Sequence, residues 1–213
     1  MPFIFRKIAS LSITIPYFLY DILKRKDSRK AVLIIERKRG EYQLSTTEHK
    51  AGAPKSVHCK VITVSDTRDQ ESDKSGALMI ELLEAAGHKV VDYCIVKDET
   101  EPIRHEILKG CERADIEAIL TNGGTGIAKR DVTIETVAQL LEKEIVGFGE
   151  LFRMLSYTED IGSAAILSRA IAGVVHNKAV FSTPGSTGAV RLAMDKLILP
   201  ELGHVVREIK KDL

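Results

Sequence analysis

Short apolar runs alternate with segments of helical periodicity from residue 57 onward, and this alternation constrains the fold more than any other feature. Val57 to Ser65, Lys89 to Val96 and Ile116 to Leu120 are apolar and rich in β-branched residues, which is typical of buried strands. Residues 75–86 and 102–111 carry apolar residues at helical spacing. A strand–helix–strand–helix–strand order predicts a parallel sheet with right-handed crossovers.

The ends of these segments carry recognisable signals. Ser75 is expected to cap the first helix, and Gly87 stands where a helix commonly stops. Further helices are expected from Thr133 and over residues 147–156. The runs 171–175 and 179–182 flank a short polar connection of His, Asn and Lys, which predicts an antiparallel hairpin.

Two glycine-rich loops follow predicted strands. Thr121-Asn122-Gly123-Gly124-Thr125-Gly126 can turn its N–H groups into a concave surface for phosphate, because glycine adopts positive φ freely. Residues 183–188 form a second such loop before a helix, whose N-terminus favours anions. Ligands of parallel sheets bind beyond the carboxyl ends of strands, where Asp66 and Asp98 also fall. Two phosphate-binding loops are therefore predicted, with ordinary strand-to-helix turns as the alternative.

Composition and motif spacing exclude several functional classes. Residues 57–213 hold 19 Lys and Arg against 25 Asp and Glu, so nucleic acid is not an expected partner. The three cysteines are widely spaced, which favours reduced thiols and a cytoplasmic protein over a disulfide framework or a zinc site. The first glycine loop fits neither a P-loop nor the dinucleotide fingerprint, because Lys129 lacks a preceding glycine and occupies a position where the fingerprint requires one.

Residues 1–56 are predicted to be an N-terminal extension to a domain spanning residues 57–213. Ile8 to Leu19 is apolar, but Pro16 interrupts it and no small-residue cleavage site follows, so a secretory signal is not supported. The run is also shorter than the roughly twenty apolar residues of a membrane-spanning helix. A loose helix on a membrane surface is one interpretation, although no stable membrane association is expected.

A second interpretation, which we favour, is that residues 1–43 are upstream sequence included by a mis-annotated start. Residues 38–41 can be back-translated into an unbroken purine run resembling a bacterial ribosome-binding site, and Leu44 into an alternative start codon. The nucleotide sequence of the gene tests this, since the idea fails without such a run before TTG or CTG. Residues 45–56 are expected to form a flexible arm under any interpretation.

Several ordered motifs carry a family resemblance. They are Val64 to Arg68, Val96 to Glu99, Thr121 to Gly126, Arg130 to Thr133, Met154 to Ser156, Leu167 to Arg169, Pro184 to Ser186 and Leu199 to Leu202. With these motifs, residues 55–210 resemble the family of molybdenum cofactor biosynthesis proteins that includes MoaB, MogA and the gephyrin G domain. The resemblance implies an α/β fold of three layers, with a mostly parallel sheet, helices on both faces and a C-terminal β-hairpin.

The resemblance implies adenylylation of molybdopterin, in which the terminal phosphate of molybdopterin attacks the α-phosphorus of Mg-ATP and pyrophosphate leaves. It assigns Asp98 and Asp131 as catalytic carboxylates that bind Mg²⁺, a metal that prefers oxygen ligands. For each aspartate, helix capping is the competing interpretation. The resemblance also implies ATP as co-substrate, molybdopterin as ligand and assembly into a homotrimer or homohexamer.

Most of the remaining site residues are assigned by matching the family motifs, whereas Asp66, Ser75 and Gly76 are assigned because they fall at the end of the first strand and the start of its helix. The expected contacts to nucleotide and phosphate are Gly123, Gly124, Thr125, Gly126, Pro184, Gly185 and Ser186. The expected contacts to substrate are Asp66, Ser75, Gly76 and Ser168. Turn formation, solvation and helix burial are the alternatives for these residues. A binding protein that holds molybdopterin or a precursor without adenylylating it is the alternative function, and the presence of both aspartates favours the enzyme. The sequence leaves open whether molybdenum or tungsten is the eventual metal.

Overall fold

The computed structural model describes residues 52–213. The interpretations that concern residues 8–19 and 38–44 lie outside the described residues. The division of the chain at residues 56 and 57 therefore stays a prediction.

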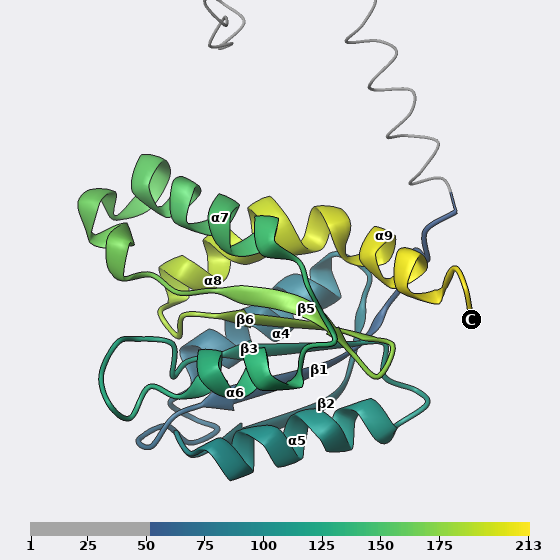
Figure 1. The fold of residues 1–213 in the computed structure, drawn as a ribbon, viewed down its shortest axis with the longest axis horizontal. Helices are drawn as coiled ribbons and strands as arrows, with labels where there is room; N and C mark the ends of the chain where they lie inside the picture. Colours follow the sequence, from purple (N-terminus) through teal and green to yellow (C-terminus); the bar gives the residue numbers. More distant parts are fainter. Residues whose placement is uncertain (1–51) are drawn as a thin grey trace, which may run out of the picture. The chain divides into compact units, whose positions relative to one another are not determined.

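Six strands form one sheet in the order β2-β1-β3-β6-β5-β4 (Figure 1). Strands β2, β1, β3 and β6 run parallel, whereas β5 is antiparallel to β6 and β4 is antiparallel to β5. The predicted mostly parallel sheet is thus confirmed. The strands are β1 (His58–Val64), β2 (Lys89–Val96), β3 (Ala118–Asn122), β4 (Lys143–Glu144), β5 (Ile171–Val175) and β6 (Lys178–Thr183).

Helices cover both faces of this sheet, which confirms the three-layer α/β architecture (Figure 1). One apolar core lies between the sheet and α4, α7, α8 and α9, and a second lies between the sheet and α5 and α6. The helical segments are α4 (Lys74–Ala85), α5 (Thr100–Glu112), α6 (Thr133–Leu140), α7 (Val146–Leu155), η1 (Ser156–Asp160), η2 (Gly162–Leu167), α8 (Thr187–Ala193), η3 (Met194–Ile198) and α9 (Leu199–Lys210).

Strand β1 shows how the two cores are built. Successive side chains of a strand point to opposite faces, so Val61 packs in the first core and Ile62 in the second. Lys60 points to the same face as Ile62 and is completely buried. Its ammonium group lies 2.5 Å from Glu106 of α5 and 3.1 Å from Asp92 of β2, so the buried charge is paired.

The element boundaries confirm the predicted end of the first helix and correct two details, the cap of that helix and the length of the hairpin connection. Gly87 follows α4 with φ of +86°, as expected of a helix stop. Asp73, not Ser75, caps α4, because its carboxylate accepts a hydrogen bond from the Gly76 N–H at 3.0 Å. His176 and Asn177 alone turn the β5–β6 hairpin with φ of 44° and 60°, and Lys178 already belongs to β6.

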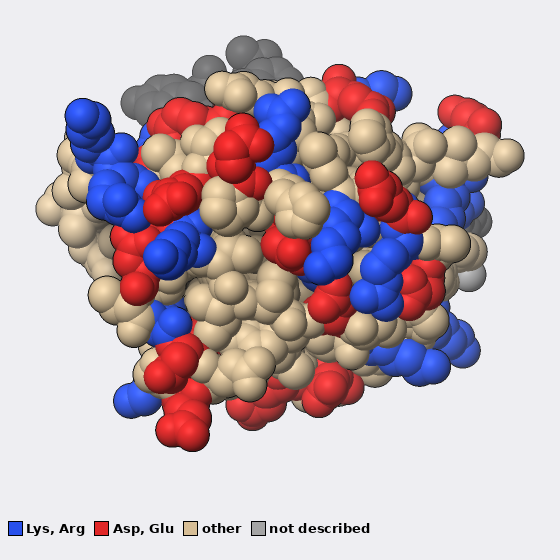
Figure 2. Space-filling view, turned by 90° about the horizontal axis from the view of Figure 1, so that it is seen from below, with Lys and Arg blue, Asp and Glu red and all other residues tan. Residues whose placement is uncertain are grey.

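The described surface mixes charges. Figure 2, the view from below Figure 1, shows acidic and basic side chains interspersed on this face of the molecule. Within residues 52–213, no helix combines the length and the apolar character needed to cross a bilayer.

Candidate functional site

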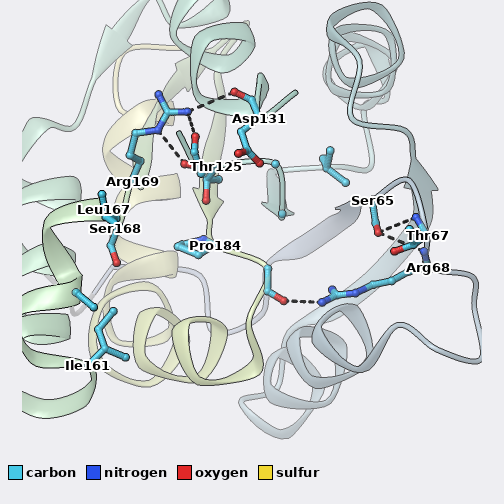
Figure 3. A pocket seen from close by; sticks show the side chains of 16 residues that line it. Ser65, Thr67, Arg68, Thr125, Asp131, Ile161, Leu167, Ser168, Arg169 and Pro184 are labelled. Atoms are coloured by element: carbon cyan, nitrogen blue, oxygen red, sulfur yellow. Dashed lines mark hydrogen bonds between the residues drawn. The ribbon is translucent and has the colours of Figure 1, made fainter. Parts of the chain in front are cut away.

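Three loops meet at the carboxyl edge of the parallel strands. In the sheet register Thr63 pairs with Asn122, and Asn122 pairs with Thr183, so β1, β3 and β6 end side by side. The loops that follow them surround a cavity of about 490 Å³ (Figure 3). Its lining comprises Val64, Ser65, Thr67, Arg68, Gly123, Gly124, Thr125, Gly126, Asp131, Ile161, Ala164, Leu167, Ser168, Arg169, Pro184 and Gly185.

The two glycine loops touch each other, which explains why side chains are absent there. A Cβ on Gly185 would lie 3.0 Å from Cα of Gly123. Gly123 itself has φ of +101°, and a Cβ there would lie 2.1 Å from the carbonyl oxygen of Val64. Glycine is therefore required by both backbone conformation and space.

The donor surface of the first loop is smaller than the sequence predicted. The Gly123 N–H donates to the carbonyl of Thr183 at 3.0 Å, so it is not available to a phosphate. The N–H groups of Gly124, Thr125 and Gly126 make no hydrogen bond to any atom of residues 52–213. These three amides are the donors that this loop can offer to an anion.

Asp131 lines the cavity beside this loop. Its Oδ2 accepts a hydrogen bond from the Ala128 N–H at 2.8 Å and would lie 2.6 Å from a Cβ on Gly126. The residue that precedes α6 at the N-cap position is Val132, so Asp131 is not the helix cap that the competing interpretation required. Its carboxylate is fixed at the cavity by the turn over residues 128–131.

Asp98 lies behind Gly124, next to the cavity lining. Its Oδ1 is buried, has no hydrogen-bond partner within residues 52–213, and would lie 2.2 Å from a Cβ on Gly124. Burial raises the pKa of Asp98, and the negative charges of Asp131 and Asp66 raise it further, against the opposing charge of Arg130. Glu99, not Asp98, occupies the N-cap position of α5.

This donor set fits a magnesium ion. Asp98 has an unpaired carboxylate oxygen, and the negative charge of Asp131 disfavours its ionised form, so a bound cation would stabilise the Asp98 carboxylate. Residues 52–213 contain no cluster of three or more His, Cys, Asp or Glu side chains suited to a metal. Magnesium often takes only one or two protein carboxylates and completes its shell with water and substrate phosphates, so two aspartates suffice.

The structure places two more of the predicted residues at or near the cavity. Ser168 lines it, next to Leu167 (Figure 3). Asp66 lies outside the lining, where it forms an ion pair with Arg130 at 2.7 Å and accepts a hydrogen bond from the Asp98 N–H at 3.3 Å. Asp66 thus contacts Asp98 rather than the cavity.

Three predicted residues lie away from the cavity. Ser75 is fully buried, and its hydroxyl donates to the side-chain oxygen of Asn122 at 2.7 Å. Gly76 is packed so that a Cβ would lie 2.6 Å from Oγ1 of Thr63. Ser186 caps α8, since its hydroxyl accepts a hydrogen bond from the Ala189 N–H at 3.2 Å. None of the three belongs to the lining of the cavity, and their assignment to the substrate and the phosphates stays a prediction.

Two arginines of the cavity were not predicted as site residues. Arg68 donates to the carbonyl of Gly185 in the second loop at 3.0 Å and to the hydroxyl of Ser75. Arg169 donates to the carbonyl of Thr125 in the first loop at 2.8 Å. Both lie within the family motifs, but their bonds join residues far apart in the chain, so the sequence pattern alone does not reveal the roles.

Comparison with known proteins decides the family. A sequence profile described as a probable molybdopterin binding domain matches residues 60–204. The molybdenum cofactor biosynthesis protein B of Bacillus subtilis is 65% identical over 169 residues, which is 79% of this chain and 99% of the relative. The chain belongs to the molybdenum cofactor biosynthesis protein B family, MoaB. This membership places it in molybdenum cofactor biosynthesis.

Solved structures agree with the MoaB assignment. A crystal structure of a molybdenum cofactor biosynthesis protein B is 64% identical, with a TM-score of 0.74 over 75% of this chain and 99% of that chain. The tungsten cofactor synthesizing protein MoaB from Pyrococcus furiosus is 38% identical, with a TM-score of 0.68 over 74% of this chain and 99% of that chain. A MogA structure is 27% identical, with a TM-score of 0.64 over 71% of this chain and 99% of that chain.

Proposed function

We propose that this MoaB-family chain is a molybdopterin adenylyltransferase that uses Mg-ATP and releases pyrophosphate. The observation that carries the proposal is the convergence of both glycine loops and Asp131 on one cavity, with Asp98 directly behind Gly124. A ligand in this cavity meets free backbone amides from one loop and a carboxylate, which suits phosphates accompanied by a metal.

The chemistry needs little from the protein beyond positioning. A phosphate monoester has a second pKa of about 6, so the molybdopterin phosphate is largely dianionic near neutral pH and needs no general base. One of its oxygens forms a bond to the α-phosphorus of ATP as the bond to the bridging oxygen of pyrophosphate breaks. The amides of Gly124, Thr125 and Gly126 would bind phosphate oxygens and hold the reacting groups together.

Mg²⁺ is the cofactor that we propose, held by Asp98 and Asp131. When bound, it would neutralise phosphate charge that the amides alone cannot balance. Arg68 and Arg169 add positive charge at the cavity, and each also donates to a backbone carbonyl of a glycine loop. Ser168 contributes a hydroxyl from the wall that also contains Ile161 and Leu167, where an organic ring could pack.

A pyrophosphate-release assay tests the proposal. Purified protein receives molybdopterin, ATP and Mg²⁺, and we expect release that depends on molybdopterin. Asp131→Ala should lower the rate by about 100-fold or more, because a carboxylate at the reacting phosphates is lost. Asp195→Ala removes an exposed acid of η3 outside the cavity and should leave the rate unchanged.

Two outcomes would count against the proposal. If the unmodified protein binds molybdopterin but releases no pyrophosphate, the alternative of a non-catalytic binding protein replaces the enzyme. If Asp131→Ala releases pyrophosphate at the unmodified rate, Asp131 has no part in the reaction.

A further inference from the structure

Arg169 is bonded to the first glycine loop along one edge of its guanidinium group (Figure 3). Its Nε donates to the carbonyl of Thr125 at 2.8 Å. Its Nη2 donates to the carbonyl of Gly126, and to that of Asp131 at 3.4 Å. The planar guanidinium group of Arg169 thus donates to three carbonyl oxygens, which come from both ends of the loop.

The other edge of the guanidinium group is fixed by Glu135 of α6. The Glu135 carboxylate accepts from Nη1 at 2.5 Å and from Nη2 at 3.3 Å, a two-point pairing that holds the arginine plane in one orientation. All three guanidinium nitrogens therefore have acceptors within the protein. Arg169 lines the cavity while its guanidinium group is hydrogen-bonded to the loop and to Glu135.

These bonds fix the direction of loop amides. A trans peptide is planar, and its C=O and the following N–H point in opposite directions. Holding the Thr125 carbonyl on Arg169 therefore fixes the N–H of Gly126 on the far side of the same peptide plane. The backbone of a glycine residue reorients easily, so hydrogen bonds from outside the loop are needed to hold its peptide planes in place.

We propose that Arg169 is a positioning residue that orders the first glycine loop for binding the phosphates of a nucleotide. The proposal rests on the proposed function, because it takes a nucleoside triphosphate as the ligand of the loop. Lysine cannot replace the arginine here, since a single ammonium group lacks the planar fork that reaches three carbonyls and a carboxylate together. Glu135 supports the same arrangement from α6.

Four variants test this inference. Arg169→Ala removes the restraint, and Arg169→Lys keeps the charge without the fork. Glu135→Gln keeps Arg169 but removes the carboxylate charge that pairs with it. This variant tests the inference if both Arg169 variants fold poorly. Arg191→Lys is the matched control, because Arg191 is exposed on α8 and contributes nothing to this cavity.

The first measurement is hydrogen exchange, in protein without ligand, of two protected amides that hold this loop: that of Gly123, which donates to the Thr183 carbonyl, and that of Thr133, which donates to the Gly124 carbonyl. We expect exchange to accelerate in Arg169→Ala and Arg169→Lys, less in Glu135→Gln, and not at all in Arg191→Lys. A fall in thermal stability without faster exchange of these two amides would indicate a general structural role and overturn the inference.

The second measurement is the Kd for Mg-ATP by calorimetry. Arg169→Lys should weaken binding by about 10- to 100-fold, in line with the loss of a residue that orients binding groups, whereas Arg191→Lys should bind normally. Equal affinity in Arg169→Lys and unmodified protein would overturn the inference while leaving the proposed function intact. No Mg-ATP binding by the unmodified protein would overturn the proposed function, and with it the role of Arg169 in nucleotide binding.

Discussion

At the scale of single residues, the site depends on glycine positions that have no room for a Cβ atom. A Cβ on Gly123 would meet the Val64 carbonyl of β1, which is backbone and cannot rotate away. A Cβ on Gly124 would lie 2.2 Å from the Asp98 carboxylate and 2.3 Å from the Thr133 hydroxyl. Steric exclusion thus links the glycine loop to both the sheet and the acidic residues.

Gly123→Ala should therefore destabilise the protein by about 2–4 kcal/mol, because it combines a positive φ with a backbone clash. The change is measured as a fall in the free energy of unfolding by urea. Gly147→Ala is the matched control: its added Cβ meets nothing within 4 Å and lies in the first turn of α7. The control should be neutral or stabilising by up to about 1 kcal/mol. An equal effect of the two substitutions would refute the steric explanation.

Residues that are close in the chain could be placed at the cavity from the sequence, whereas contacts between distant segments could not be predicted. The glycine loop and Asp131 are recognisable because their spacing along the chain is itself the functional pattern. Arg169 donates a hydrogen bond to the carbonyl of Thr125, 44 residues away, and such a bond cannot be predicted from periodicity or spacing. Ser75 looked suited to the site, but the fold turns its hydroxyl inward to Asn122.

At the scale of elements, β1 and α5 are joined by a buried ion pair inside the second core. Burial alone would raise the pKa of Glu106, but hydrogen bonds from Lys60 and Lys109 outweigh it and lower the pKa of Glu106 to about 2. The pKa of Lys60 is raised even though burial opposes this, because Glu106 and Asp92 favour its charged form. Each partner therefore compensates the desolvation of the other.

Glu106→Gln should lower the stability near pH 7 by about 1–3 kcal/mol, since Lys60 loses a buried counter-ion. A depressed carboxyl pKa contributes stability that is present above its unfolded value of 4.5 and is lost as the pH falls through about 2. The difference between the two proteins in urea unfolding should accordingly shrink over this range. Glu84→Gln, an exposed acid of α4, is the control. A difference that stays constant down to about pH 2 would contradict the ion-pair account.

The elements themselves were largely predictable. The apolar runs and helical periodicity predicted five strands and helices at α4 to α8, because hydrophobic periodicity directly reflects burial, but helix α9 (Leu199–Lys210) was not predicted. Strand β4 was missed because Lys143 and Glu144 are exposed and pair with β5 only through the backbone. The cap of α4 was assigned to Ser75 instead of Asp73 because both residue types are good caps, and only tertiary contacts decide between them.

At the scale of the whole molecule, apolar side chains are exposed on α7, η1 and η2. Leu151, Met154 and Tyr157 are 46%, 53% and 62% exposed, and Ile166 is 85% exposed. Such a concentration of exposed apolar groups marks an interaction surface. We propose that a second copy of the chain covers it, within the homotrimer or homohexamer that the family resemblance implies.

Sedimentation velocity tests the assembly. The unmodified protein should sediment as a trimer or hexamer, and Leu151→Lys with Met154→Lys should shift it to smaller species, because two charges would be buried without partners. Leu213→Lys, at an exposed C-terminal residue, is the control. A monomeric unmodified protein would contradict the proposed assembly.

The reaction product shows whether the cavity joins AMP to molybdopterin. Unmodified protein is incubated with molybdopterin, Mg²⁺ and ATP labelled at the α-phosphorus, and the pterin fraction is separated and analysed by mass spectrometry. We predict a labelled pterin heavier by one adenylyl group, formed with unmodified protein and lost with Asp131→Ala. Bound molybdopterin that stays unlabelled in the presence of Mg-ATP would contradict the claim and leave a binding protein of the same pathway.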